Sequence, residues 1–166
     1  VVNLDNCENK QQAIENAAAI FVGGGNTFHL LHMMQKLGIV SSIKHVVNNG
    51  IAYVGWSAGS NVACSSLSTT NDMPIIQPAS FEALDFIEYQ INPHYTEQTI
   101  PGNGGESRLQ RLEEYLAVNR SEKVLCIPEA SYVQVEQGIL SYHGTESGKI
   151  LTHQDALDIF NGEEIL

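Results

Sequence analysis

The chain has 166 residues, which suits one domain, and its acidic residues outnumber its basic ones by 19 to 8, giving a net charge of -11. Such a surface repels nucleic acid and anionic membranes, so neither is expected as a partner. No run of eighteen apolar residues occurs, so no transmembrane helix is expected. The three cysteines, Cys7, Cys64 and Cys126, lack C-x-x-C spacing and fit the reduced thiols of a cytoplasmic protein.

Taken in order, the spacing of apolar residues predicts strands that alternate with helices. Strands are expected at 1–4, 18–22, 51–54, 89–92, 124–127, 132–136, 139–142 and 149–151. Helices are expected at 8–17, 28–37, 39–49, 61–66 and 106–119. Such a pattern favours an α/β fold with a mostly parallel sheet and helices on both faces, and 132–142 adds an antiparallel hairpin at one edge.

The first residue is Val1 rather than methionine, and the stretch 1–4 looks like a strand entered midway through a fold. We therefore expect one α/β domain over 1–166 that lacks an N-terminal piece, including at least one strand. Because this loss would leave sheet edges uncovered, we expect the 166-residue chain alone to be poorly soluble or to be assembled with something that covers the edge.

The centre of the chain is Gly55-Trp56-Ser57-Ala58-Gly59, a G-x-S-x-G pattern that follows the predicted strand at 51–54. Two glycines allow a sharp turn from strand to helix that lifts the serine hydroxyl out of the sheet. By chance such a pattern arises in a chain of this length roughly once in twenty. The alternative is a glycine-rich turn with Ser57 as a helix N-cap, but the strand in front favours a catalytic nucleophile.

A serine nucleophile needs amide groups that stabilise the oxyanion of its intermediate. The turn Gly23-Gly24-Gly25 ends the neighbouring predicted strand, and the amides of Gly24 and Gly25 can complete an oxyanion hole with that of Ala58. A nucleotide-phosphate site is less consistent with this turn, since neither G-x-G-x-x-G nor a P-loop lysine is present.

The serine also needs a base, and His94 is the best placed of six histidines. It follows a predicted strand, as Ser57 does, and the carboxyl ends of parallel strands share one edge of a sheet. The alternative is a loop histidine bonded to the backbone. His29 and His32 are three residues apart on a predicted helix, but no acidic or cysteine ligand lies close in sequence, so we expect no metal site.

A carboxylate should orient the base, and two residues are candidates. Asp72 lies in a polar loop downstream of Ser57, and Glu129 ends the predicted strand at 124–127. Both can reach the same edge of the sheet, so the residues alone leave the choice open. The structural alternatives are an Asx-turn for Asp72 and a cap or salt bridge for Glu129.

Six blocks of the sequence, in the same order, resemble the peptidase E family, the α-aspartyl dipeptidases of the S51 serine peptidases. The blocks are Phe21-Val-Gly-Gly-Gly-Asn-Thr-Phe28, Gly55-Trp-Ser-Ala-Gly-Ser-Asn-Val-Ala-Cys64, Thr69-Thr-Asn-Asp-Met-Pro74, Gln90-Ile-Asn-Pro-His94, Glu106-Ser-Arg-Leu-Gln-Arg111 and Ile127-Pro-Glu129. The resemblance implies a flavodoxin-like fold, hydrolysis of dipeptides with an N-terminal aspartate, and a cytoplasmic location. It also suggests a homodimer and indicates no cofactor or metal.

The resemblance assigns Ser57 as nucleophile and His94 as general base. It makes Asp72 the preferred orienting acid, while Glu129 matches a glutamate that is also a family candidate for that role. If Asp72 orients His94, Glu129 can instead bind the substrate ammonium or support the site. Arg108 matches the arginine expected to grip the substrate's aspartate side chain, and the alternative is a surface arginine paired with a nearby glutamate.

Two other functions remain open from the sequence. One is another S51-like hydrolase, of the cyanophycinase type or an esterase, although an esterase has no need of the Arg108 guanidinium. The other is a catalytically silent domain that binds a small molecule, against which the intact set of Ser57, His94 and Asp72 argues.

Overall fold

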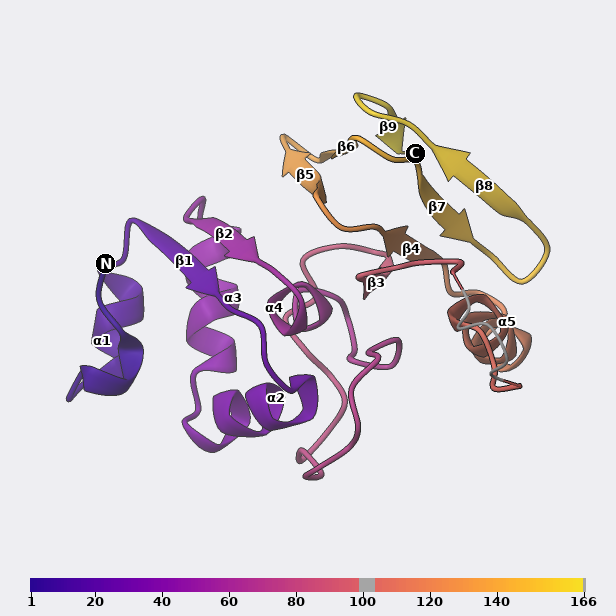
Figure 1. Ribbon diagram of the computed structural model, residues 1–166. Helices are drawn as coiled ribbons and strands as arrows, with labels where there is room; N and C mark the ends of the chain where they lie inside the picture. The colour runs from indigo at the N-terminus through magenta and orange to yellow at the C-terminus, as the bar shows by residue number, and fades with distance from the viewer. Residues whose placement is uncertain (99–103, 166) are drawn as a thin grey trace. The chain divides into compact units, whose positions relative to one another are not determined.

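The computed structural model describes residues 1–98 and 104–165, which form two compact units, Val1–Glu88 and Tyr89–Leu166. Each unit contains both strands and helices (Figure 1). The α/β class predicted from the sequence is confirmed, and a single domain over 1–166 stays a prediction.

The first unit contains a parallel pair of strands joined by two helices. Its elements are η1 (Leu4–Asn6), α1 (Lys10–Glu15), β1 (Ala19–Val22), α2 (Thr27–Lys36), α3 (Val40–Asn48), β2 (Ala52–Gly55) and α4 (Ala58–Asn61). Ala19 lies opposite Ala52 and Val22 lies opposite Gly55. Parallel neighbours need a long crossover, which α2 and α3 provide. The strand, glycine turn and helix predicted over 18–37 are thereby confirmed.

The ends of α2 follow from its sequence. The Asn26 side chain accepts a hydrogen bond from the amide of His29 at 3.1 Å, so Asn26 is the N-cap. Gly38 has φ +66°, a left-handed conformation in which glycine avoids the steric cost of a side chain, and it stops the helix.

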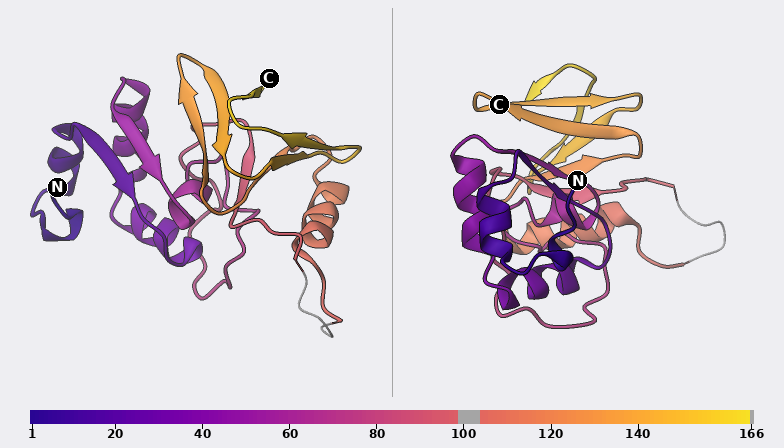
Figure 2. Two further views of the ribbon diagram at one scale, coloured as in Figure 1. Left: turned by 45° about the horizontal axis from the view of Figure 1, so that its top comes forward. Right: turned by 90° about the vertical axis from the view of Figure 1, so that its left-hand side faces the viewer.

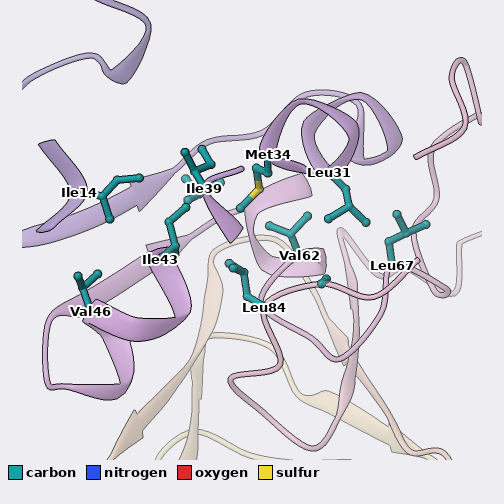
Figure 3. Close-up of a cluster of buried hydrophobic side chains, with 11 residues drawn as sticks. Ile14, Leu31, Met34, Ile39, Ile43, Val46, Val62, Leu67 and Leu84 are labelled. Carbon is teal, nitrogen blue, oxygen red and sulfur yellow. The ribbon is translucent and has the colours of Figure 1, made fainter. Parts of the chain in front are cut away.

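The core of the first unit is a cluster of buried hydrophobic side chains, most of which Figure 3 labels. Val22 belongs to this core with residues of all three helices α1, α2 and α3, and Ile20 and Tyr53 pack against it. Phe21 and Val54 are on the opposite face and are 60% and 44% exposed. The helices α1, α2 and α3 therefore pack on the face of this pair that carries Ile20, Val22 and Tyr53.

The second unit combines a parallel pair with antiparallel strands. Its elements are β3 (Gln90–Pro93), α5 (Arg108–Val118), β4 (Val124–Ile127), β5 (Ser131–Glu136), β6 (Ile139–Gly144), β7 (Gly148–Leu151), β8 (Ala156–Ile159) and β9 (Glu164–Ile165). The strands β3 and β4 are parallel and fully buried, and β7 and β8 continue the sheet antiparallel to them. Leu112 and Leu116 of α5 cluster with Val124 and Cys126 of β4.

The predicted hairpin exists as β5–β6, the orange ribbon in both views of Figure 2. It forms a separate three-stranded sheet with β9, while the antiparallel hairpin that borders the parallel strands is β7–β8. The antiparallel part of the fold is thus larger than the sequence predicted.

Two local predictions were wrong, and two short strands were not predicted. The stretch 1–4 is not a strand, because the Asn3 side chain accepts a hydrogen bond from the amide of Asp5 and starts the short helix η1. The helix predicted over 61–66 stops early, because Ala63 and Cys64 donate to carbonyls only three residues back. The strand β8 was missed because three of its four residues are exposed at a sheet edge, and β9 has only two residues.

None of the helices in the described residues has the length and apolar character needed to span a membrane.

Candidate active site

Ser57 occupies a sharp turn between β2 and α4, as the G-x-S-x-G pattern predicts. Its backbone has φ 53° and ψ -117°, a conformation that residues with a side chain rarely adopt. Such strain persists only where the surroundings enforce it, and it is concentrated at functional sites.

Close packing explains both glycines of the pattern. A Cβ at Gly59 would overlap the carbonyl oxygen of Val22, and a Cβ at Gly55 would overlap that of Gly59. The turn therefore presses against the end of β1, where the amide of Trp56 also donates to Val22 O at 3.2 Å. No larger residue fits at position 55 or 59 without displacing the turn.

Hydrogen bonds hold the turn from both sides. The carbonyl of Ser57 accepts from the amide of Ser60 at 3.0 Å and from the Ser60 hydroxyl at 2.6 Å. The hydroxyl of Tyr53 donates to the carbonyl of Gly59 at 2.6 Å, and burial raises the pKa of this phenol. Tyr53 was not among the residues proposed from the sequence. The only feature that could have indicated its role is its polar hydroxyl within an otherwise apolar predicted strand.

The glycine turn Gly23-Gly24-Gly25 lies beside the serine. The position that a Cβ of Gly24 would take is 3.2 Å from Ser57 Cβ and 3.4 Å from Ser57 Oγ. Gly25 has φ +133° and no atom within 4 Å of its Cβ position. The structure thus brings Gly24, Ser57 and the adjoining Ala58 together, and their role as oxyanion donors, with Gly25, stays a prediction.

Asp72 also belongs to the first unit, where its carboxylate binds Thr27. Asp72 Oδ2 accepts hydrogen bonds from the amide and the hydroxyl of Thr27, each at 2.6 Å. Sequence reasoning missed Thr27, although it stands in the block that contains the glycine turn. The orientation of His94 by Asp72 stays a prediction.

In the second unit, His94 and Glu129 are in direct contact. His94 Nδ1 lies 2.5 Å from Glu129 Oε1, and the side chains are 45% and 79% exposed. Such a bond fixes the orientation of the imidazole and leaves Nε2 as the other ring nitrogen. Of the two carboxylates that the sequence offered, Glu129 is the one that the structure places on the imidazole.

Backbone geometry supports this pair. His94 directly follows β3 and has φ 57°, and Ala130, next to Glu129, has φ 55°. The Ser131 hydroxyl donates to the carbonyl of Pro128 at 2.5 Å and closes the turn around Glu129. Ser57, His94 and Glu129 thus each follow the carboxyl end of a parallel strand.

Arg108 is the first residue of α5, after a capping box made by Ser107 and Gln110. Its Nη1 donates a hydrogen bond, 3.1 Å long, to the carbonyl of Pro93, which is the residue before His94. Among the described residues, no ion pair involves Arg108, and Glu106 instead pairs with Arg111 at 3.8 Å. This geometry does not support the surface salt bridge considered for Arg108.

The two histidines of α2 do not form part of a metal centre in the described residues. No group of three or more histidine, cysteine or acidic side chains there, including His29 and His32, could hold an ion.

Comparison with known proteins agrees with the blocks in the sequence. The family model described as Peptidase family S51 matches residues 1–142. A protein named Peptidase E from Nostoc is 46% identical over 140 residues, which cover 84% of this chain and 58% of the relative. Peptidase E of Haemophilus influenzae is 43% identical over 151 residues, covering 91% of this chain and 69% of the relative. The chain thus spans little more than half the length of the first of these relatives.

Solved structures agree on the fold. A peptidase from an acI-B1 Actinobacterium superposes with a TM-score of 0.69 at 21% identity, covering 93% of this chain and 62% of that one. A peptidase E protein from Listeria monocytogenes superposes with a TM-score of 0.55 at 17% identity, covering 90% and 62%. With the family model matched over 142 residues, the chain belongs to peptidase family S51.

Proposed function

We propose that this chain carries the catalytic residues of a serine dipeptidase that hydrolyses dipeptides with an N-terminal aspartate. The observation that carries the proposal is the strained conformation of Ser57, held between two glycines with Gly24 beside its hydroxyl. The stability of the fold does not require a strained serine at this point, whereas the presentation of a nucleophile on a sharp turn does require one. Relatives named Peptidase E, at 43–46% identity, support the same activity.

In this proposal Ser57 Oγ attacks the peptide carbonyl, and His94 takes the hydroxyl proton at Nε2. The same proton then passes to the leaving amine. Glu129 holds Nδ1 and stabilises the imidazolium, a role we assign to it rather than to Asp72 because of the 2.5 Å contact. Backbone amides at Gly24, Gly25 and Ala58 stabilise the oxyanion.

Arg108 supplies the specificity for aspartate. A guanidinium has five N–H donors in a planar fork and can bind a carboxylate through two of them. The bond to Pro93 O fixes one nitrogen, Nη1, so the fork has a defined orientation. In a protein of net charge -11, such a local cation is what an acidic substrate requires. A neutral side chain would leave the guanidinium unpaired, which selects against it.

The test is steady-state hydrolysis of Asp-Leu beside Asn-Leu and Glu-Leu, with Ser57→Ala as the blank. We expect turnover of Asp-Leu alone, abolished in the variant. Hydrolysis of esters or of neutral dipeptides at a similar rate would favour another S51-like hydrolase, such as a cyanophycinase-type enzyme or an esterase.

No turnover of any substrate by folded protein would favour a silent binding domain instead. Isothermal titration calorimetry with Asp-Leu then distinguishes a domain that binds this dipeptide from a protein that acts on a different substrate. We also propose that the protein acts in the cytoplasm, which its three cysteines without C-x-x-C spacing support.

A further inference from the structure

The start of α2 is held by a carboxylate from a distant part of the first unit. Asp72 lies 45 residues after Thr27, and its Oδ2 accepts from both the amide and the hydroxyl of that residue. The first turn of α2 has no acidic residue of its own. Asp72 therefore supplies the negative charge that the positive end of a helix dipole favours.

Further hydrogen bonds close this contact into a network, here called the polar latch (Asn26, Thr27, Thr70, Asp72 and Met73). The Thr70 hydroxyl donates to Thr27 Oγ1 at 3.0 Å and accepts from the amide of Asp72 at 3.2 Å. Asn26 Nδ2 donates to the carbonyl of Met73 at 2.8 Å. Thr27 itself is fully buried, so its hydroxyl has no access to water in place of these partners.

The polar latch is attached to one end of the glycine turn at 23–25. The other end of that turn is β1, which pairs with β2. Within the turn, Gly25 has no atom near its Cβ position, while Gly24 lies against Ser57. The turn is therefore placed by its two ends together with the contacts of Gly23 with Trp56 and of Gly24 with Ser57. Because catalytic groups must be held within roughly 0.5 Å, the polar latch controls how the Gly24 amide meets the reacting carbonyl.

We propose that Thr27 and Asp72 are positioning residues that fix the glycine turn beside Ser57, an inference that rests on the proposed serine peptidase activity. Asp72 acts through Thr27 and not through the imidazole of His94. The polar latch stabilises the transition state, in which the oxyanion has formed, more than it stabilises bound substrate.

The experiment measures kcat and KM for Asp-Leu in Thr27→Val, Thr27→Ser, Asp72→Asn and the double variant Thr27→Val/Asp72→Asn. Thr27→Val should lower kcat by about 10- to 100-fold with KM nearly unchanged, because a small displacement of a catalytic group costs rate. Thr27→Ser, which keeps the hydroxyl, should restore kcat. The double variant should lose little more than the worse single one, because both changes break the same link. Thr145→Val, an exposed threonine, is the matched control.

An alternative role for Asp72 predicts a different pattern. If Asp72 orients His94, Asp72→Asn should lower kcat by about 10⁴-fold while Thr27→Val stays near wild type. That result would overturn the inference. Circular dichroism and urea unfolding of each variant show whether a loss of rate reflects a loss of fold.

A second readout does not depend on activity. The NMR order parameters of the Gly24 and Gly25 amides should fall in Thr27→Val and return toward wild type in Thr27→Ser. Unchanged order parameters in Thr27→Val would also overturn the inference. If the wild-type protein cleaves no dipeptide, the proposed function fails, while the order parameters still report whether the polar latch holds the turn.

Discussion

At the scale of single residues, backbone strain marks the candidate site. Five non-glycine residues have positive φ, among those that the structure describes: Ser57, Asp85, His94, Ala130 and Gln137. Three of them are Ser57, His94 and the neighbour of Glu129. Each such conformation costs about 1–3 kcal/mol, so its recurrence at these three strand ends indicates a constraint other than stability.

Substitution of Glu129 tests whether this residue orients the imidazole of His94. Glu129→Gln should lower kcat for Asp-Leu by about 10²- to 10⁴-fold with little effect on KM, because an amide neither fixes the imidazole tautomer nor stabilises the imidazolium. Glu114→Gln, on the exposed face of α5, is the matched control. A rise in KM that exceeds the fall in kcat would instead assign Glu129 to the substrate ammonium.

Gly59 tests the packing of the turn around Ser57. Gly59→Ala should lower the free energy of unfolding by about 1–3 kcal/mol, because the added methyl overlaps the Val22 carbonyl. Thermal unfolding measures the change. Gly104→Ala, which adds a methyl in open space, should leave Tm close to wild type. Equal Tm values for the two variants would contradict the packing described here.

At the scale of elements, the sequence predicts what depends on local chemistry. The unit of β1, glycine turn and α2 follows from an apolar run, a glycine cluster and helical spacing, and the Asn26 side chain caps α2. The strand predicted at 1–4 is wrong because the Asn3 side chain starts η1, and the spacing of apolar residues does not predict such a side-chain cap.

The contacts of the site depend on tertiary placement, which sequence spacing does not contain. Asp72 and Glu129 are equally able to reach an imidazole when only their positions in the chain are known. The structure separates them, because the turn after β4 brings Glu129 to His94 while the loop at 69–74 brings Asp72 to Thr27. The same limit explains why Tyr53 and Thr27 were not predicted.

Tyr53 connects β2 to α4 and tests this connection. In a longer helix the Gly59 carbonyl would accept from the amide of Ala63, which bonds Ser60 instead. Tyr53→Phe should leave the carbonyl without its partner, destabilise the fold by about 1–3 kcal/mol and lower kcat more than it raises KM. Urea unfolding and Asp-Leu hydrolysis measure the two effects. Tyr132→Phe, at a tyrosine that is 58% exposed, should change neither stability nor activity. Stability and activity of Tyr53→Phe equal to those of the wild type would show that Tyr53 does not support the turn.

At the scale of the whole molecule, two buried thiols report on the two units. Cys64 belongs to the first and Cys126 to the second, and both are fully buried. Burial raises the pKa of Cys126 to about 12, so at pH 8 its reactive thiolate is rarer than that of an ordinary thiol.

Thiol labelling across a urea series therefore tests the prediction of a single domain. If the chain unfolds as one domain, Cys64 and Cys126 should become reactive at the same urea concentration, because a single unfolding transition exposes both thiols. Cys7, which is partly exposed, should react without urea and serves as the internal control. Two separate midpoints, resolved by mass spectrometry of the labelled peptides, would show two domains.

The conformation of Ser57 also has a consequence for evolution. Glycine would adopt φ 53° without the steric cost that serine pays, so a lineage under selection for folding alone should drift toward glycine at position 57. Keeping serine there requires continued selection for its hydroxyl. Descendants that no longer need catalysis should therefore lose this residue early, and they should become more stable when they do.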